Sequence, residues 1–335
     1  MLNPNAKLVE DLSKVEKKAT RDGYGSGLVE AGEKDERVVV LCADLTESTR
    51  CQGFKDKFPE RFIEIGVAEQ NMATVASGMA NYGKIPFIAS YAAFSPGRNN
   101  EQIRTTIALN NVPVKIGGAH AGISVGPDGA THQQLEDIAL MRVQPNMVVI
   151  VPCDSVEAHK ATVAAAFNGK PTYIRFGREK SAVFTTKDTP FEISRAEIFR
   201  EISPSSQSSS GRQLCTIVGC GMLLYNALVA AEELMQEGID CEVINSHTIK
   251  PFDEKTIIAS AQKTGAVVSV EEHQINGGLG SAVAECLAKN HPVPQEFIGV
   301  QDRFGESGNT DELLEHFGMG VGSIKKAVKK AISRK

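Results

Sequence analysis

Features that would assign a protein to a secreted, membrane-bound or metal-stapled class are missing from this sequence. Its 335 residues contain no C-x-x-C pair, and the seven cysteines are scattered at positions 42, 51, 153, 215, 220, 241 and 286. This spacing is typical of reduced cytosolic thiols rather than of a disulfide framework or a zinc site. No apolar run reaches membrane-spanning length, and the charged N-terminal stretch MLNPNAKLVEDLSKVEKK lacks the apolar core of a signal peptide. We therefore expect a cytoplasmic protein with no membrane partner.

A strong charge of one sign is also missing. The net charge is −5 and no long basic run is present, which argues against a nucleic-acid partner. If the substrate is anionic, its basic contacts must be local. Hydrophobic residues make up 41 % of the chain, enough for sizeable cores, and the length favours two compact domains.

Apolar strands alternate with amphipathic helices along almost the whole chain. In the first part, we expect strands at 37–42, 62–65, 85–89, 112–116, 147–151 and 171–176, and helices over 7–18, 20–33, 67–81, 98–110 and 132–142, with a further helix that Asp154 caps and that ends near 167. In the second part, we expect strands at 214–218, 241–245, 266–270 and 297–300, and helices over 222–237, 253–263, 281–289, 310–317 and 322–333. Continuous Val/Ile strands between helices predict parallel sheets covered on both faces. The predicted fold class is α/β with two doubly wound domains, a mostly parallel one over 1–195 and a smaller one over 213–335, joined by a Ser-rich linker over 196–212.

The segment IGVAEQNM, residues 65–72, sets the carboxylate of Glu69 among apolar residues where a strand gives way to a helix. Apolar residues then recur at helical spacing as far as Met79. A carboxyl group on the inner face of such a turn would be desolvated and would favour a shared proton. An ordinary acid in the first helical turn, favoured by the helix dipole, remains the alternative at this point.

A second cluster, GPDGATHQ at residues 126–133, combines a tight glycine turn with Asp128 and His132, four residues apart at an expected helix start. Thr131 has the spacing of a capping box. Backbone N–H groups at such a start suit an anion or a polar ligand, and an Asp-Gly turn with a capping threonine is the alternative. His120 lies just before this cluster, among glycines at the end of a strand, where open parallel sheets bind ligands.

Other candidates also follow predicted strands. Tyr91 and Phe94 are three residues apart and could present a flat face to a heteroaromatic ring or pack in the core. Arg175 and Arg178 could bind phosphate, lie in solvent or pair with nearby acids. The stretch GGLG at 277–280 lacks the spacing of a phosphate-binding loop, so we interpret it as a close-packing turn before a helix.

In this order, the segments resemble the transketolase family. The resemblance is carried by IGVAEQNM, SYAAF, HAGISVGPDGATHQ, VIVPCDS, YIRFGR and SVEEHQINGGLGS, and it covers about residues 19–320. It concerns the half of the family that contains a thiamine-diphosphate (pyrimidine) binding domain and a C-terminal domain. The resemblance implies that the first predicted domain is the former and the second domain the latter.

The resemblance also implies roles for single residues. Glu69 matches the glutamate that hydrogen-bonds the aminopyrimidine of thiamine diphosphate and favours its imino tautomer. Phe94 matches the aromatic that stacks on this ring, and Tyr91 lies where the family has a second aromatic. Asp128 and His132 match a pair that contacts substrate hydroxyls near the reacting carbons.

The family positions that contact the sugar phosphate correspond to Arg21, Ser48, His120 and Arg178, although the flanks of the first two are less distinctive. Four donors converging on one phosphate would explain how an acidic protein binds an anion. The chain departs from the family at two places: Pro127 replaces a common acidic residue, and a Pro-Gly pair follows the two aromatic residues. Neither change removes a catalytic group, but both leave the preferred acceptor sugar open.

Transketolases also have an N-terminal domain, which holds the diphosphate and a divalent metal (Mg or Ca) through a Gly-Asp-Gly motif and a downstream Asn. This sequence contains no Gly-Asp-Gly. We therefore expect the C-terminal subunit of a split transketolase, with no metal ligand of its own, that works with an N-terminal subunit in a heterotetramer. The expected reaction transfers a two-carbon ketol unit from a ketose phosphate to an aldose phosphate, as in the pentose phosphate pathway.

Three other functions remain open on the sequence. The catalytic half of a deoxyxylulose-phosphate synthase has similar motifs, although these synthases are normally single long chains. The β subunit of a 2-oxoacid dehydrogenase has a similar length, but its substrates lack a phosphate for His120 and Arg178. A non-catalytic assembly subunit would not need Glu69, Asp128 and His132 together.

Overall fold

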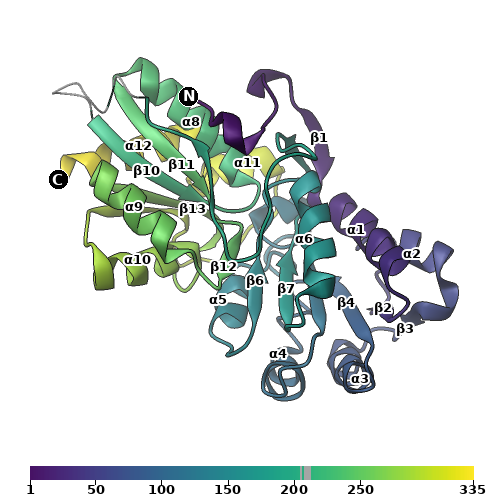
Figure 1. Ribbon diagram of the computed structural model, residues 1–335. Coiled ribbons are helices and arrows are strands. Elements are labelled where there is room, and N and C mark those ends of the chain that lie inside the picture. The colour runs from purple at the N-terminus through teal and green to yellow at the C-terminus, as the bar shows by residue number, and fades with distance from the viewer. Residues whose placement is uncertain (204–205, 207–212) are drawn as a thin grey trace.

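The computed structural model describes residues 1–203, 206 and 213–335, which form two parallel-rich α/β layers (Figure 1). The seven-stranded sheet has the order β12-β6-β7-β5-β4-β2-β3, and only the edge strand β12 is antiparallel to its neighbour. The five-stranded sheet has the order β14-β13-β10-β11-β9, with β9 antiparallel at the edge. A two-stranded ribbon, β1-β8, is antiparallel. The predicted fold class, two mostly parallel α/β domains, is confirmed.

The strands of the first part are β1 Glu16–Ala19, β2 Val38–Cys42, β3 Phe62–Glu64, β4 Ile85–Tyr91, β5 Lys115–Ala119, β6 Val148–Ile150, β7 Thr172–Arg175 and β8 Lys180–Val183. Its helices are α1 Thr20–Lys34, α2 Gln52–Lys57, α3 Glu69–Asn81, α4 Asn100–Gln102, α5 Asp137–Arg142 and α6 Ser155–Phe167. The strands of the second part are β9 Glu197–Arg200, β10 Gln213–Gly219, β11 Ile239–Asn245, β12 Thr248–Lys250, β13 Val267–Gln274 and β14 Gln295–Val300. Its helices are α8 Leu223–Gln236, α9 Glu254–Thr264, α10 Leu279–Asn290, α11 Thr310–His316 and α12 Val321–Ser333.

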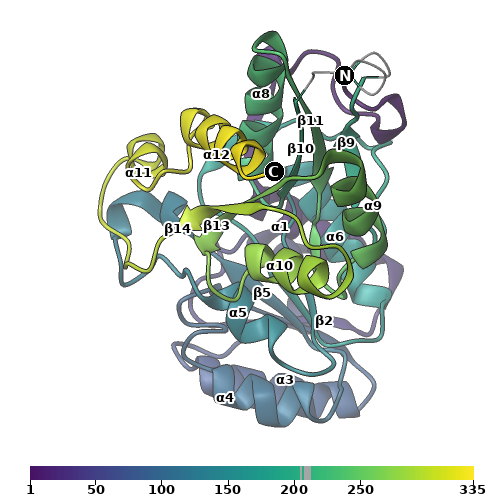
Figure 2. The same ribbon diagram turned by 90° about the vertical axis from the view of Figure 1, so that its left-hand side faces the viewer.

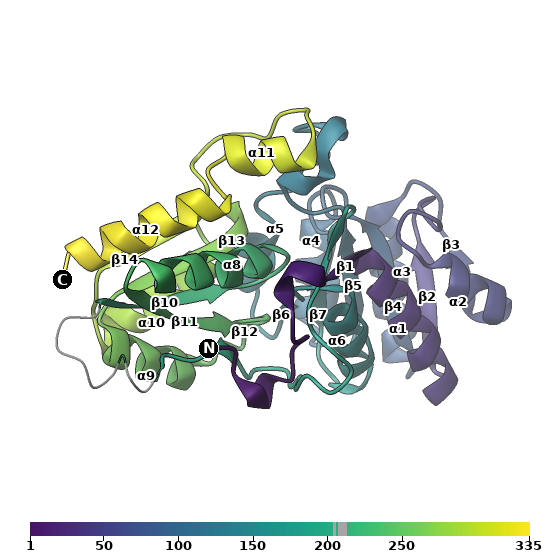
Figure 3. The same cartoon turned by 90° about the horizontal axis from the view of Figure 1, so that it is seen from above.

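Buried strands of the first sheet send alternate side chains to two different cores. In β2, Val38 and Val40 pack with α1 and α6 on one face, while Val39 and Leu41 pack with α3 on the other. The second of these cores continues into the five-stranded layer, where it includes Ile244 of β11. Figure 2 shows α3 and α4 at the end of the molecule away from α8 and α9, and Figure 3 shows α1 and α6 along the opposite face of the first sheet from α3.

One edge strand crosses between the layers, because β12 of the second part pairs with β6 of the first sheet. β9, which falls inside the predicted linker, pairs with β11 of the second sheet. Residues 204–205 and 207–212, which make up most of the remaining predicted linker, lie outside the described residues. The layers are therefore joined through β12 as well as through the core.

Three predicted helices differ in the structure. The helix expected over 7–18 is wrong, because Asp11 caps only a short 3₁₀ turn at Leu12–Lys14 and the chain then extends into β1. The helix expected over 132–142 begins only at Asp137, because Thr131 lies in a turn and does not cap it. The segment expected over 98–110 is helical, but Ile103–Ala108 adopts the wider π form. The cap at Asp154 is confirmed, since its carboxylate accepts the backbone N–H groups of the first turn of α6.

One buried acid lies at the seam between the layers. The carboxylate of Glu157, in the first turn of α6, accepts the N–H of Cys153 at 2.7 Å and the side-chain amide of Asn245 in β11 at 2.6 Å. Burial raises the pKa of Glu157 to about 7. Because the folded state holds this proton more tightly than the unfolded state, the stabilisation is complete below about pH 4.5 and is lost as the pH rises through 7.

Glu157→Gln should therefore flatten the fall in stability between pH 4.5 and 7.5. The change removes a titration worth at most about 3 kcal/mol while keeping the shape of the side chain. Denaturant unfolding at several pH values measures the slope, with the exposed Glu36→Gln as the matched control. Equal slopes in Glu157→Gln and in the parent chain would contradict the assignment.

Candidate active site

Glu69 begins α3 at the carboxyl ends of β2, β3 and β4. Its side chain is only 2 % exposed, and its backbone carbonyl accepts a hydrogen bond from the Asn99 amide at 3.0 Å. Ser90, at the end of β4, donates to one carboxylate oxygen at 3.4 Å, and Arg98 donates to the other at 2.8 Å. The preceding turn depends on Gly66, whose φ of +74° suits a glycine. The buried Glu69 carboxylate thus lies beside the cationic guanidinium of Arg98.

An aromatic wall lies next to this carboxylate. Tyr91 stacks on the His120 ring with centroids 3.9 Å apart, and Phe94 lies 5.9 Å from Tyr91. The His132 ring meets Phe94 edge-on at 5.5 Å. Four of the predicted site residues, two from β4 and its following turn and two from the segments after β5, are therefore gathered in one place. The Arg98 guanidinium lies over the Phe94 ring, 4.5 Å from its centroid.

His120 stands in a cationic environment. It lies one residue beyond β5 with a left-handed φ of 53°, a conformation that non-glycine residues rarely adopt. Burial, together with the charges of Arg21 and Arg178, lowers the pKa of His120 to about 3. The imidazole is therefore neutral at physiological pH, with one N–H to donate.

Within the part of the chain that the structure describes, two buried polar atoms, His120 Nδ1 and Arg21 Nε, have no hydrogen-bond partner. Such atoms are costly to leave unpaired, so a ligand that hydrogen-bonds to them would be stabilised. Arg178, whose charge acts on His120, donates to the carbonyl of Val125 at 3.0 Å. Positive groups with unused donors are what an anion-binding site requires.

The loop between β2 and α2 closes one side of this region. The Glu64 carboxylate holds the loop by accepting from Asp44 N at 2.8 Å and from the Thr46 hydroxyl at 3.1 Å. The Ser48 carbonyl in turn accepts from Arg21 at 3.1 Å. Ser48 therefore lies beside Arg21, as the resemblance implies, and its backbone carbonyl makes the contact.

Asp128 lies at the edge of the cluster. It ends a short 3₁₀ segment and faces Arg178 at 3.5 Å, a pair that is one-third exposed on both sides. Arg178 also faces Glu179 at 3.5 Å. Arg175, the last residue of β7, is engaged elsewhere, because it forms a buried ion pair with Asp137 at 2.8 Å.

The GGLG stretch is a close-packing turn. The Glu271 carboxylate accepts the N–H groups of Leu279 and Gly280, each at 2.7 Å, where a phosphate would otherwise bind the start of α10. A Cβ on Gly280 would lie 2.7 Å from Phe297. The interpretation made from the sequence is therefore confirmed.

Sequence reasoning missed three residues of the site. Arg98 is 29 positions from Glu69, and no sequence spacing links the two. Glu64 reads as the end of a strand, and Arg50 as a surface residue, yet Glu64 orders the loop and Arg50 adds positive charge near His120. The left-handed φ of Arg50, 64°, would only have been visible in a structure.

Within residues 1–203, 206 and 213–335, no three His, Cys, Asp or Glu side chains gather into a metal-binding group. A search of the same residues finds no helix that is long and apolar enough to cross a membrane.

Known proteins with similar sequences and structures are transketolases or parts of transketolases. The family description "Transketolase, pyrimidine binding domain" matches residues 16–182, and "Transketolase, C-terminal domain" matches 207–324. The 6-deoxy-6-sulfo-D-fructose transketolase subunit SqwH of Clostridium sp. (strain MSTE9) is 41 % identical over 96 % of this chain and 97 % of its own length. Human transketolase is 35 % identical over 95 % of this chain, which spans 50 % of the human protein.

A solved structure described as "Split gene transketolase, inactive beta4 tetramer" superposes with a TM-score of 0.86 and 42 % identity, over 95 % of this chain and 99 % of that one. The two family matches, the relative SqwH and the split-gene structure all point to transketolase. SqwH and the split-gene structure each match this chain over nearly their whole length. The chain belongs to the transketolase family and is built from its pyrimidine-binding and C-terminal domains.

Proposed function

We propose that this chain is the C-terminal subunit of a split, thiamine-diphosphate-dependent transketolase. It would transfer a two-carbon ketol unit from a ketose phosphate to an aldose phosphate. The observation that carries the proposal is the convergence of a buried carboxylate, an aromatic wall and a cationic cluster at the carboxyl ends of one sheet, the side where α/β sheets bind ligands.

The residues around Glu69 fit the pyrimidine ring of the cofactor. The Arg98 guanidinium is flat and rich in N–H donors, and it both covers Phe94 and donates to the buried Glu69 carboxylate. An aminopyrimidine needs the same two contacts, a stacking face and an acceptor, so Arg98 makes in this chain the contacts expected of the ring. When bound, thiamine diphosphate supplies a carbanion that adds to the substrate carbonyl and stabilises the transferred unit.

This chain's own groups then have separate tasks. Glu69 holds the ring through a hydrogen bond and shares its proton, while Phe94 and Tyr91 fix the ring plane and exclude water. His132 faces the side of the aromatic wall where the reacting carbons would lie. Asp128, paired with Arg178, orients substrate hydroxyls from the rim.

The cationic cluster supports an anionic sugar. Arg21 Nε and His120 Nδ1 provide unused donors, and Arg178 and Ser48 complete the set that the family positions imply. The relative SqwH is described as acting on 6-deoxy-6-sulfo-D-fructose, so a sulfonated sugar is a second candidate substrate. A sulfonate presents three acceptor oxygens, as a phosphate does.

The partner in this proposal is an N-terminal transketolase subunit with a Gly-Asp-Gly motif, which holds the diphosphate and the divalent metal. Two similar proteins support it: SqwH is named as a subunit, and the split-gene structure is described as an inactive tetramer of β chains. Each of these covers nearly the same length as this chain. We propose a cytoplasmic heterotetramer in which this chain also contacts a copy of itself.

Arg98→Gln should increase the affinity of the reconstituted enzyme for thiamine diphosphate severalfold. The arginine competes with the ring for Glu69 and Phe94, so its loss removes the competing contact. Calorimetric titration of the cofactor measures the change without relying on turnover. Weaker binding in Arg98→Gln would mean that the arginine holds the cofactor instead of substituting for it.

Arg178→Ala should raise KM for phosphorylated sugars by about tenfold or more, with little change for unphosphorylated analogues, because the lost contact is to the anion. Steady-state kinetics on a ketose phosphate, a sulfonated ketose and a neutral ketose separate the candidate substrates. Arg195→Ala, an exposed arginine on the other layer, is the control. An equal rise for neutral and anionic sugars would remove Arg178 from the site.

A further inference from the structure

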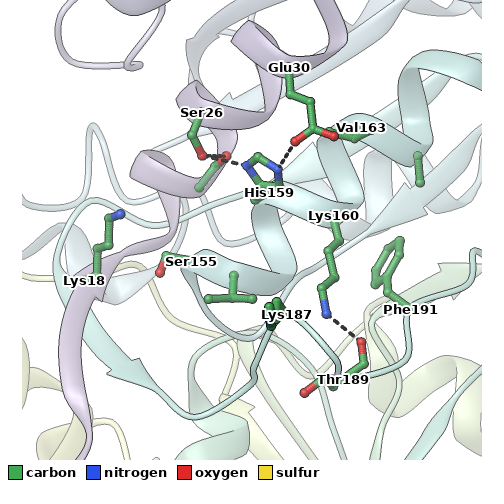
Figure 4. Close-up of a pocket in the computed structure, with 13 residues that line it drawn as sticks. Lys18, Ser26, Glu30, Ser155, His159, Lys160, Val163, Lys187, Thr189 and Phe191 are labelled. Carbon is green, nitrogen blue, oxygen red and sulfur yellow. Dashed lines mark hydrogen bonds and ion pairs between the residues drawn. The ribbon is translucent and has the colours of Figure 1, made fainter. Parts of the chain in front are cut away.

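A second pocket lies on the far side of α1 from the loop that carries Ser48. It has a volume of about 670 Å³ and follows the seam between α1 and α6, with the turn after β8 closing one end (Figure 4). Cavities of this size hold small organic ligands. Beneath the pocket, α1 and α6 pack closely because α1 has glycines at the contact. A Cβ on Gly23 would lie 1.9 Å from the Ser155 carbonyl, and a Cβ on Gly27 would lie 2.7 Å from Thr162. The floor is therefore rigid.

One wall is fixed by a chain of hydrogen bonds. Ser26 Oγ lies 2.8 Å from His159 Nδ1, and His159 Nε2 lies 2.7 Å from Glu30 Oε2 (Figure 4). The order Ser-His-Glu resembles a nucleophilic relay, but Ser26 also donates to the Gly23 carbonyl at 3.0 Å. The nearby N–H groups of α6 that an oxyanion would need, those of Val156 and Glu157, are already bound to Asp154. This wall is therefore suited to binding and orienting a ligand rather than to nucleophilic catalysis.

The pocket is positively charged. Lys18 and Lys187 line the pocket and are exposed, and within the described residues neither has a hydrogen-bond or ion-pair partner for its side chain. Lys160 lies deeper and donates to the carbonyls of Thr186 and Thr189 at 2.7 and 2.6 Å. The single acid among the lining residues, Glu30, is already engaged by Lys34 and His159.

The rest of the lining is apolar. Val156, Val163 and Ala164 of α6 and the ring of Phe191 face the cavity. A ligand that fills it needs an apolar body against these side chains and a negative group at the Lys18 and Lys187 end. Pure inorganic anions leave the apolar part wet, and neutral aromatics leave two ammonium groups without a counter-charge.

We infer that the α1–α6 pocket is a second ligand site, separate from the proposed active site, for a small amphipathic carboxylate or phosphate ester. Its negative group pairs with Lys18 and Lys187, and its apolar part lies against Val163 and Phe191. The ligand shares α1 with Arg21, so its site borders the helix that also carries a proposed phosphate contact.

Calorimetric titration of the full chain with phenyl phosphate, benzoate, inorganic phosphate and benzyl alcohol tests the inference. We expect the two amphipathic anions to bind in the α1–α6 pocket, and the other two probes to bind in this pocket at least tenfold more weakly. Lys18→Met together with Lys187→Met should weaken phenyl phosphate binding at least tenfold, and Val163→Phe should block it by filling the cavity. A structure of the soaked chain would place the ring against Phe191.

Controls separate this site from the proposed active site. Lys84→Met, an exposed lysine elsewhere on the chain, and Arg178→Ala should leave phenyl phosphate binding unchanged. Loss of binding in Arg178→Ala, with none in the double lysine variant, would place the ligand in the proposed active site and overturn the inference. Equal affinity for benzyl alcohol would also overturn it. Thermal melting of Val163→Phe checks that the variant is folded, and the two surface lysine changes keep the test decisive if it is not.

Discussion

Glu69→Gln should lower kcat of the reconstituted enzyme by about a hundredfold or more, the range expected when a positioned proton-transfer group is removed. Glutamine keeps the shape and one acceptor but cannot share a proton with the cofactor ring. Because Glu69 is 2 % exposed and bound to Ser90 and Arg98, no water molecule can readily take its place. The measurement is steady-state turnover of a ketose phosphate and an aldose phosphate.

The fold and the assembly should survive this change. Glutamine can still accept the Arg98 hydrogen bond, so size-exclusion chromatography and thermal melting should match those of the parent chain. Glu101→Gln, an exposed acid in α4, is the matched control and should keep full activity. Near-normal turnover in Glu69→Gln would remove the carboxylate from the proposed mechanism.

The purified chain alone should give no measurable turnover, and activity should appear when an N-terminal transketolase subunit is added. Within the described residues, the chain offers no cluster of carboxylates or imidazoles for a divalent metal, and GGLG at the start of α10 is filled by Glu271. Titrating the partner at fixed chain concentration should raise activity until the two are equimolar, and the increase should require the divalent metal.

Sequence periodicity predicted most of the fold, because buried parallel strands are continuous apolar runs and glycines end the helices. It failed where local signals competed with tertiary contacts. The polar segment 7–18 has helical spacing, yet its end pairs as β1 with β8, more than 160 residues away in sequence. The pairing of the edge strands β9 and β12 left no signal in either segment, since short edge strands have no distinctive pattern.

The proposed site was predicted where residue type and topology agreed. Residues after the ends of parallel strands must meet at one edge of the sheet, so Glu69, Tyr91 and His120 came together. Side-chain pairing could not be predicted in the same way. Arg98 and Arg175 are both arginines that follow strands or turns of the first sheet, but one covers the aromatic wall while the other is buried against Asp137. Only the positions of their carboxylate partners in space distinguish them.

Cofactor binding most directly tests the proposal that this chain supplies only the pyrimidine side of the cofactor site. Thiamine diphosphate with Mg²⁺ should be titrated by calorimetry into this chain, into the N-terminal subunit and into their equimolar mixture. The account predicts stoichiometric, tight binding only to the mixture, and a large loss of affinity when Phe94 is changed to Ala. Tight binding to this chain alone would contradict it.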